Sequence, residues 1–385
     1  MGAHLIRAGH PARPAGAGPQ ASFTRPTLAA RLAFRHKSGQ RGHPSLGFAL
    51  KSEETTDMIV ITGGAGFIGS NLVAALEARG GESLVVADWL GIGDKWRNLG
   101  KRELLAIIPP EELFDYLDDR RGDIETVFHM GAVSSTTEAD ADLIIRTNLT
   151  LSQRLWSWCA ESRVRLIYAS SAATYGDGKA GFDDDWSSAA LAKLTPLNAY
   201  GWSKQLFDRW VARQIERGYP APPQWAGLKF FNVYGPNEYH KGGQKSVVVQ
   251  IADHVIGGGR ATLFRSHHPD YADGGQLRDF VSVDDVVAIM MWLYETPKLS
   301  GLFNVGTGKA RSFLDLANAV FAAAGRKPDI HYVDTPDNIR ANYQYFTEAK
   351  MDRLRAAGCP IVPTSLEDGV TAYVKNYLTQ ADRYR

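Results

Sequence analysis

The chain contains 385 residues, of which 44% are hydrophobic, and it carries a formal net charge of +1. It is long enough to bury a large core, and its balanced charge points to neither nucleic acid nor a membrane surface as a partner. No apolar run approaches the roughly 20 residues that a membrane-spanning helix needs. The two cysteines, Cys159 and Cys359, cannot build a disulfide framework, so we expect a reducing, cytoplasmic location.

Residues 1–57 differ in composition from the rest of the chain. They contain eight Lys/Arg and three acidic residues, a net charge of +5 that leaves −4 for the remainder. Three interpretations are open: a transit peptide, which is basic and poor in acids; a disordered arm; or a mis-annotated extension upstream of a gene that begins at Met58. We favour the third, because Met58 is the first residue of the first expected strand.

An apolar, β-branched run at 58–62 opens the expected fold and is followed by glycines and a helical pattern. This order is the context of a dinucleotide-binding fingerprint, in which Gly63, Gly66 and Gly69 allow a tight turn and the close approach of a pyrophosphate. A second apolar run ends in Asp88, which can accept hydrogen bonds from the adenosine ribose. The alternative is a glycine-rich turn followed by a solvated carboxylate, but the complete order of elements favours the cofactor site.

Apolar runs then alternate with helical patterns, which predicts a Rossmann-type α/β fold, a doubly wound parallel sheet with helices on both faces. In such sheets the ligand binds at the carboxyl ends of the strands, where the strand order reverses. The elements expected after Asp88 are a strand at 101–108, a helix at 111–120, a strand at 126–129, a helix at 140–161, a strand at 165–170, a helix at 198–216 and a strand at 226–231.

Beyond residue 231 the alternation loosens. We expect an NAD(P)-binding Rossmann domain at 58–230 and a smaller, mainly substrate-binding C-terminal lobe at 231–385, from which the chain returns to the sheet. Asp284 is the expected N-cap of the helix at 284–294. The other elements expected here are a helix at 246–256, a strand at 261–264, a helix at 313–324, a strand at 329–333 and two C-terminal helices.

The helix at 198–216 carries Tyr200 and Lys204, a phenol and an ammonium four residues apart and therefore on one face. A phenol is a poor base at neutral pH, but a nearby ammonium and an oxidised nicotinamide favour the phenolate. Ser171, at the end of the preceding strand, can hydrogen-bond a substrate oxygen beside that phenol. The spacing alone is common on solvated helices; after a dinucleotide fingerprint it predicts a catalytic site.

Together these motifs resemble the extended short-chain dehydrogenase/reductases that modify nucleotide sugars, the NAD-dependent epimerase/dehydratase family. The resemblance covers 58–385 and includes, besides the residues above, the stretches 231–236, 278–281, 284–286 and 303–308. Four stretches resemble more narrowly the branch that epimerises ADP-heptoses, namely 131–138, 169–176, 240–242 and 343–347.

The resemblance implies an isomerase that interconverts ADP-D-glycero-β-D-manno-heptose and its L-glycero isomer for lipopolysaccharide core synthesis. The C6″ hydride passes to bound NADP, with NAD as the alternative, and returns to the other face of a transient 6″-ketone. Two acid/base groups are then needed, which the resemblance assigns to Tyr200 and Lys241. It also implies a homo-oligomer, with no metal and no nucleic-acid or membrane partner.

Individual contacts also follow from the resemblance. The cofactor residues are Gly63, Gly66, Phe67, Ile68, Gly69, Asp88, Trp89, Lys95, Met130, Gly131, Ala132, Val133, Ser134, Asn148 and Lys204. The substrate residues are Ser134, Asn232, His240, Gln250, Phe264, Arg278 and Tyr343. The planar guanidinium of Arg278 suits a diphosphate; the alternative is a structural ion pair with Asp279 or Asp284.

Four positions depart from the family pattern. Trp89 stands where Asn is usual, Pro110 where a further Lys is usual, and Gly243 and Gln250 where Ser and His are usual. Asp88 suits a free ribose 2′-hydroxyl and would repel a 2′-phosphate, whereas Lys95 would attract one. We favour NADP over NAD.

Three other functions share this fold. A UDP-sugar 4-epimerase does not call for the pair His240 and Lys241, and a 4,6-dehydratase would carry Asp-Glu where Ala172 and Ala173 stand. A non-catalytic, NADP-sensing regulator would normally lack the Tyr/Lys pair. These residues favour the heptose 6-epimerase.

Overall fold

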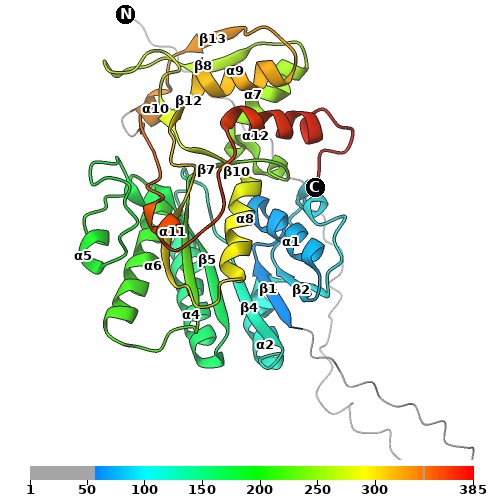
Figure 1. Cartoon of the computed structure of the whole chain (residues 1–385), viewed down its shortest axis with the longest axis vertical. Helices are drawn as coiled ribbons and strands as arrows, with labels where there is room; N and C mark the ends of the chain where they lie inside the picture. The colour runs from blue at the N-terminus through cyan, green and yellow to red at the C-terminus, as the bar shows by residue number, and fades with distance from the viewer. Residues whose placement is uncertain (1–56, 341–342) are drawn as a thin grey trace, which may run out of the picture. The chain divides into compact units, whose positions relative to one another are not determined.

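The computed structural model describes residues 57–340 and 343–385, so the interpretations of residues 1–56 lie outside the described residues. A seven-stranded parallel sheet with the order β11-β6-β5-β4-β1-β2-β3 lies at the centre of the described chain (Figure 1). This confirms the predicted doubly wound sheet. Its strands are β1 (Met58–Thr62), β2 (Ser83–Ala87), β3 (Ala106–Ile108), β4 (Ile124–His129), β5 (Arg165–Ser171), β6 (Trp225–Phe230) and β11 (Gly301–Val305).

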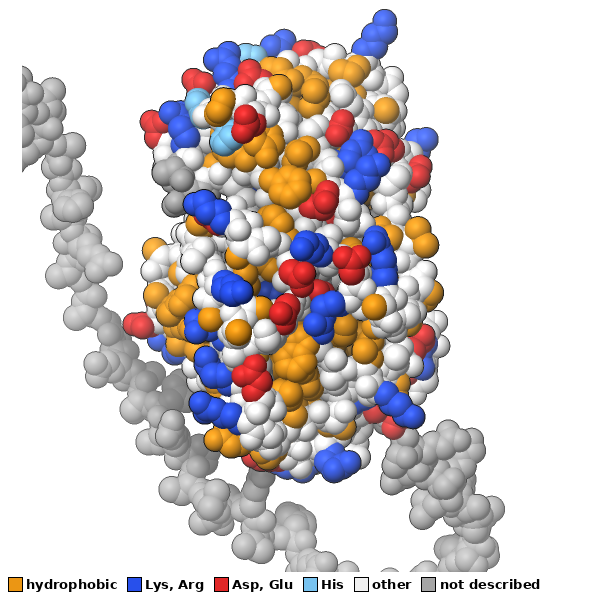
Figure 2. All heavy atoms as spheres, turned by 60° about the vertical axis from the view of Figure 1, so that its left-hand side comes forward, with side chains coloured by type: hydrophobic (Ala, Val, Ile, Leu, Met, Phe, Trp, Pro, Cys, Tyr) orange, Lys and Arg blue, Asp and Glu red, His pale blue; other side chains and the backbone are white. Residues whose placement is uncertain are grey.

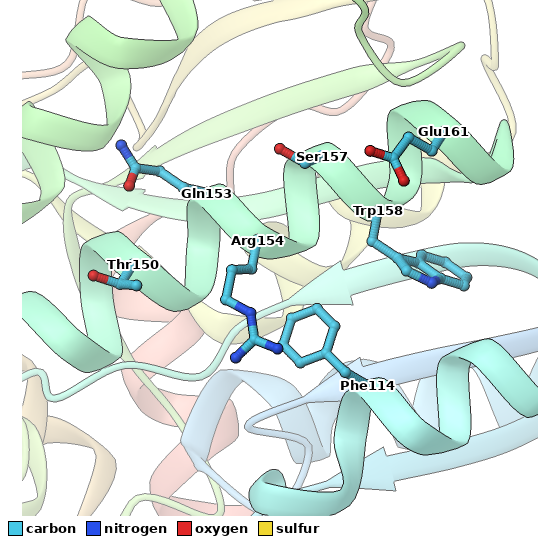
Figure 3. Close-up of a pocket in the computed structure, with 7 residues that line it drawn as sticks. All are labelled: Phe114, Thr150, Gln153, Arg154, Ser157, Trp158 and Glu161. Carbon is cyan, nitrogen blue, oxygen red and sulfur yellow. The ribbon is translucent and has the colours of Figure 1, made fainter.

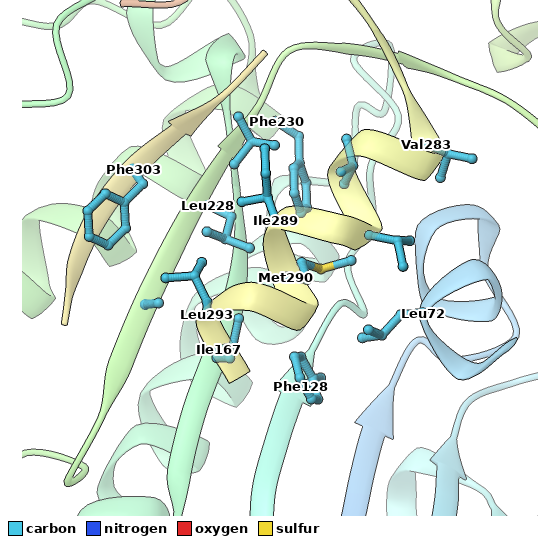
Figure 4. Close-up of a cluster of buried hydrophobic side chains, with 14 of the residues drawn as sticks. Leu72, Phe128, Ile167, Leu228, Phe230, Val283, Ile289, Met290, Leu293 and Phe303 are labelled. Atoms are coloured by element: carbon cyan, nitrogen blue, oxygen red, sulfur yellow. The ribbon is translucent and has the colours of Figure 1, made fainter. Parts of the chain in front are cut away.

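Helices pack on both faces of the sheet because its strands are apolar on both sides. Ile59 and Ile61 point into one core with helices α1 and α8, whereas Val60 points into the other with α2, α4 and α6. Figure 4 shows the first core, with Met290 of α8 lying between the sheet and α1. The bounds are α1 (Phe67–Arg79), α2 (Leu113–Asp119), α4 (Leu151–Ser162), α6 (Ala199–Glu216) and α8 (Val283–Tyr294).

The strand order reverses beside β1. Strands β2 and β3 lie on one side of it, and β4, β5, β6 and β11 lie on the other. The loops that leave the carboxyl ends of β1 and β4 therefore diverge and open a crevice between them. Thr62 at the end of β1 is in register with His129 at the end of β4, so residues distant in sequence meet at this edge.

The second half of the chain builds a smaller lobe and also completes the sheet. Helices α7 (Val247–Ile256), α9 (Phe313–Ala323) and α12 (Leu366–Tyr373) form one core with the parallel pair β8 (Ala261–Phe264) and β13 (Ile330–Val333). Between α7 and α9 the chain returns to the sheet, where α8 covers one face and β11 pairs with β6.

Shorter elements connect these parts. The short strands are β7 (Asn232–Tyr234), β9 (Leu277–Arg278), β10 (Phe280–Ser282) and β12 (Arg311–Ser312). The short helices are α3 (Ala141–Ile144), α5 (Ser188–Leu191), α10 (Asp337–Arg340) and α11 (Asp352–Ala356). The 3-10 turns are η1 (Asp94–Asn98), η2 (Pro110–Glu112), η4 (Ala172–Tyr175) and η5 (Tyr239–Gln244), and the π turns are η3 (Ile145–Thr150) and η6 (Val374–Leu378).

The start of α8 differs from the prediction. The predicted N-cap, Asp284, is wrong: the helix begins at Val283, and the Ser282 hydroxyl accepts the Asp284 N–H at 3.2 Å. Ser282 is the last residue of β10, whose pairing with β7 fixes an extended backbone there. The helix can therefore begin only after Ser282, and Ser282 takes the capping role.

Other predicted elements are shortened or divided. The strand predicted at 101–108 is limited to β3, because Glu77 of α1 engages the Arg102 guanidinium and the next N–H. The helix predicted at 140–161 is divided by the π turn η3, which contains Asn148. The two predicted C-terminal helices correspond to α11 and α12, and the short helix α10 before them was not predicted.

Candidate active site

A cavity of about 1140 Å³ opens at the carboxyl ends of the strands. Its walls come from the glycine turn after β1, the loop after β4, the end of β5, helix α6 and the segment around η5. The predicted site residues that line it are Gly63, Gly66, Phe67, Ile68, Gly69, Asp88, Lys95, Met130, Gly131, Ala132, Ser134, Ser171, Tyr200, Lys204, Asn232, His240 and Lys241. Those outside its lining are Trp89, Val133, Asn148, Gln250, Phe264, Arg278 and Tyr343.

The glycine turn after β1 leaves no room for side chains. Gly63 has a φ of +68°, and a Cβ there would lie 2.5 Å from the Gly131 Cα. A Cβ on Gly69 would lie 2.3 Å from the Gly63 carbonyl oxygen. Helix α1 begins directly after the turn, and no side chain caps its N-terminus, so its first N–H groups are available to an anion. The turn therefore fits the pyrophosphate of a dinucleotide.

Asp88 and Lys95 form the ribose end of this site. One carboxylate oxygen of Asp88 accepts the Ala65 N–H at 3.0 Å, and the other lies 2.7 Å from the Lys95 ammonium. Lys95 also donates to the Trp89 carbonyl at 2.8 Å. Asp88, which suits a ribose hydroxyl, is therefore already paired with Lys95, which suits a phosphate.

Tyr200, Ser171 and Lys204 lie together on the opposite wall. The Ser171 hydroxyl hydrogen-bonds the Tyr200 phenol, and the Lys204 ammonium donates to the Ala169 carbonyl at 2.8 Å. Burial raises the pKa of Tyr200, while the bond from Ser171 lowers it. Burial also lowers the pKa of Lys204 to about 8. A further positive charge in the site would favour the phenolate.

Lys241 reaches the same cavity from η5. Its ammonium lies 5.4 Å from the centroid of the Phe67 ring at the start of α1. Burial lowers its pKa, and the buried Glu238 carboxylate opposes that shift. A lowered pKa makes the neutral amine, which is the form that accepts a proton, more accessible. The cavity therefore brings together a phenol and an amine from different elements, Tyr200 on α6 and Lys241 on η5.

A model of the NAD dependent epimerase/dehydratase family matches residues 59–306. The chain belongs to this family. It is 51% identical over 329 residues to the ADP-L-glycero-D-manno-heptose-6-epimerase of Nitratidesulfovibrio vulgaris (strain DP4), an alignment that covers 85% of this chain and 100% of the relative. The corresponding protein of Fusobacterium nucleatum subsp. nucleatum is 45% identical over 335 residues, with 85% and 100% covered.

Solved structures of the epimerase/dehydratase family show the same fold. The Helicobacter pylori ADP-L-glycero-D-manno-heptose-6-epimerase matches with a TM-score of 0.68 at 27% identity, covering 85% of this chain and 98% of that one. The Thermus thermophilus UDP-glucose 4-epimerase, in complex with NAD, gives 0.64 at 27% identity, with 82% and 97% covered. The resemblance drawn from the motifs is confirmed.

Two of the predicted cofactor residues outside the cavity lining, Asn148 and Trp89, bond to other parts of the chain. Asn148, on the π turn η3, bonds both the N–H and the carbonyl of Val133, each at 2.9 Å, and donates to the Ser203 hydroxyl at 3.0 Å. It fixes the loop after β4 against helix α6. Trp89 is 52% exposed, and its indole N–H donates to the Glu111 carboxylate at 3.0 Å.

Three predicted substrate residues of the lobe, Phe264, Arg278 and Tyr343, form an aromatic and basic cluster beside Phe313, which itself lines the cavity. The Arg278 guanidinium lies 5.5 Å from the Tyr343 ring and 5.7 Å from the Phe313 ring. Phe264 meets Tyr343 edge to face at 6.3 Å. Within the described part of the chain Arg278 has no ion-pair partner, which disfavours the structural ion pair. Gln250 is exposed on α7.

A buried ion pair that the sequence did not predict lies behind the Tyr/Lys pair. Asp208 lies one turn after Lys204 on α6, 3.3 Å from the Lys229 ammonium, and both side chains are fully buried. Asp208 also accepts the Ser170 hydroxyl at 2.7 Å, and its charge raises the pKa of Lys204. The i, i+4, i+8 spacing from Tyr200 could have identified it.

A second hollow lies between α2 and α4. Figure 3 shows Arg154 of α4 lying against Phe114 of α2, with its guanidinium 3.8 Å from the ring centroid. Trp158 and Glu161 border the same groove. None of the predicted site residues lies there, so the groove plays no part in the site.

Proposed function

We propose that this chain interconverts ADP-D-glycero-β-D-manno-heptose and ADP-L-glycero-β-D-manno-heptose by inverting C6″, as an isomerase of lipopolysaccharide core heptose synthesis. The carrying observation is that Tyr200 and Lys241, from different elements, line one cavity beside the glycine turn. The similarity to heptose 6-epimerases along their full length supports the same substrate.

The need for two proton-transfer groups follows from the chemistry of the carbon. The C6″–H bond is not activated for simple deprotonation, so inversion requires removal and return of a hydride, which a bound nicotinamide supplies. In one diastereomer, Tyr200 exchanges the proton of the C6″ hydroxyl. Ser171 holds the Tyr200 phenol, and the Lys204 charge lies beside it. Lys241 meets the same oxygen after the 6″-ketone has turned and exchanges the proton for the other diastereomer. Each group transfers a proton only within hydrogen-bond reach of that oxygen.

NADP is our proposed cofactor, with NAD as the alternative. The glycine turn and the uncapped start of α1 fit either dinucleotide. Lys95 supports NADP, because an ammonium 2.7 Å from Asp88 can turn toward a 2′-phosphate and also reduce the repulsion between that phosphate and the carboxylate. In Lys95→Ala we expect the dissociation constant for NADP to rise at least tenfold and that for NAD to change by less than threefold, measured by titration of intrinsic fluorescence. Equal losses for both cofactors would contradict this assignment.

The surroundings of the enzyme form a separate part of the proposal. No helix in the described ranges is both long and apolar enough to cross a membrane. On the face shown in Figure 2, acidic and basic side chains are interspersed. Both cysteines are unpaired, which supports a reducing, cytoplasmic location. We also propose a homo-oligomer, which sedimentation velocity would test.

The function is tested by supplying the D-glycero substrate to the full chain without any reductant. We expect proton NMR to show the L-glycero isomer appearing, with no net change in absorbance at the reduced-nicotinamide band. An unchanged heptose would refute the substrate assignment and leave UDP- and GDP-sugars as the next candidates. A non-catalytic regulator is disfavoured, because the Ser171–Tyr200 contact and the buried Lys204 are both present.

A further inference from the structure

The position of Lys241 depends on its backbone rather than on its side chain. Within the described residues its ammonium has no hydrogen bond or ion pair; it lies 5.4 Å from the centroid of the Phe67 ring and feels the charge of the buried Glu238. Gly242, with a φ of +55°, and Gly243 follow it, and a Cβ at either position would meet no atom within 4 Å. Gly242 and Gly243 are therefore open, and the chain is held again at Ser246, whose N–H and hydroxyl donate to the buried Glu238. The residues before Lys241, Glu238 among them, must therefore fix where the ammonium reaches.

Those preceding residues are fastened at several points. Asn237 is fully buried with a φ of +72°, and its side chain donates to the Ser70 hydroxyl of α1 at 3.1 Å. Asn98 donates to the Asn237 carbonyl at 3.0 Å and lies 3.2 Å from the His240 ring nitrogen. Such a left-handed backbone is uncommon for a residue with a side chain and persists where its surroundings hold it.

The last residues of the chain add a third support to the same segment. The Arg385 N–H donates to the Asn237 side-chain oxygen at 3.0 Å. The Tyr239 hydroxyl donates to the Arg383 carbonyl at 2.8 Å, and the Tyr239 and Tyr384 rings meet edge to face at 5.2 Å. Residues 383–385, the tail of the chain, thus contact both Asn237 and Tyr239 in the short stretch that leads into Lys241.

The same tail also contacts the cofactor side of the cavity. The Arg97 guanidinium lies 4.6 Å from the Tyr384 ring centroid, and the Lys101 ammonium donates to the Tyr384 carbonyl at 2.7 Å. Arg97 belongs to η1, the turn that carries Lys95. In Figure 1 the C-terminus accordingly lies beside α1, away from the core of the lobe from which it comes.

We propose that residues 383–385 are a positioning segment for Lys241, which fastens the start of η5 to the η1 turn and so fixes the reach of the second acid/base group. The proposal rests on the proposed function for the role of Lys241, but the contacts themselves do not. Within the described chain, residues 383–385 contact no residue that lines the cavity. We expect their effect on catalysis to pass through residues 237–241.

The test compares Tyr384→Ala with Tyr384→Phe in the full chain. The Phe variant keeps the ring that meets Tyr239 and Arg97, so it should behave as the wild type, whereas the Ala variant loses both contacts. For Tyr384→Ala we expect kcat for the epimerisation to fall about tenfold, as a displaced catalytic group predicts, with KM and the dissociation constant for NADP changed less than twofold. Tyr219→Ala, which removes an exposed tyrosine elsewhere, is the matched control and should match the wild type.

Hydrogen–deuterium exchange gives a readout that does not depend on turnover. In Tyr384→Ala, and in a variant with residues 383–385 deleted, amides at 237–244 should exchange at least fivefold faster, while those of the central sheet stay unchanged. Unchanged exchange at 237–244, or a kcat equal to that of the wild type, would overturn the proposal. If the wild type fails to epimerise the heptose while exchange at 237–244 still rises, the function fails and the fastening role stands.

Discussion

The imidazole of His129 lies at the end of β4, buried between two hydroxyl groups. Its Nδ1 is 2.6 Å from the Thr62 hydroxyl and its Nε2 is 2.9 Å from the Ser152 hydroxyl. Thr62 also accepts the Gly131 N–H at 3.3 Å, so the ring supports the loop that lines the cofactor cavity. Burial, and then the positive charge of Lys204, lower the pKa of His129 to about 3.

This lowered pKa determines whether acid stabilises or destabilises the folded chain, and by how much. The unfolded chain binds the imidazole proton near pH 6.5, whereas the folded chain binds it only near pH 3, so the unfolded state takes up more protons between these values. The contribution of His129 to the free energy of unfolding is fully present above pH 6.5 and is lost as the pH falls. Acidification from pH 6.5 to pH 4 should therefore cost about 3 kcal/mol of the free energy of unfolding through His129 alone.

Urea denaturation of the wild type and of His129→Gln, at a series of pH values from 4 to 7, measures this contribution. Glutamine does not titrate, so the variant should lose about 3 kcal/mol less than the wild type over that range, whatever its stability at pH 7. The exposed His331 provides a matched control, because His331→Gln should keep the wild-type slope. Parallel curves for the wild type and His129→Gln would refute the argument.

Four further single variants test other parts of the site. Tyr200→Phe and Lys241→Met should each lower kcat at least a hundredfold while NADP stays bound in the purified protein; full activity in Lys241→Met would rule out the two-group mechanism. Lys229→Met leaves the Asp208 carboxylate buried without its partner and should lower the free energy of unfolding, measured in urea, by about 3–5 kcal/mol. Adding Asp208→Asn to this variant should partly restore the lost stability. Gly69→Ala places a Cβ 2.3 Å from a carbonyl oxygen of the turn, so NADP affinity measured by calorimetry should fall at least tenfold, and wild-type affinity would refute the close-approach role.

The sequence predicted the parts of the fold that depend on local pattern. Alternating apolar runs identified the sheet, because buried parallel strands need apolar residues on both faces. The fingerprint glycines were identified because close backbone approach excludes a Cβ. Tyr200 and Lys204 were found from helical spacing, which places both on one face. These signals require only neighbours in sequence.

The features that escaped prediction depend on contacts between distant segments. Asp284 and Ser282 are both good caps, and only the pairing of β10 with β7 decides between them. Asn98 gave no local signal, because its partners Ala65 and Asn237 lie 33 and 139 residues away. Trp89 occupies one of the predicted cofactor positions, yet its indole N–H donates to Glu111 on the surface. Hydrogen bonds of this kind join segments that are distant in sequence. They follow from the fold and cannot be predicted from the local sequence.

The late return of the chain to the central sheet constrains how this protein can fold during synthesis. Strand β6, buried along its whole length, has β11 as its outer neighbour, and β11 ends only at Val305. Helix α8, which covers α1 and the first core, is also made late, at Val283–Tyr294. A nascent chain that has emerged only as far as residue 230 therefore exposes an apolar strand edge and an uncovered face, both of which favour aggregation. Pairings of such long sequence separation also fold slowly. A fragment ending at that residue should be insoluble, even though it contains the whole nucleotide fingerprint.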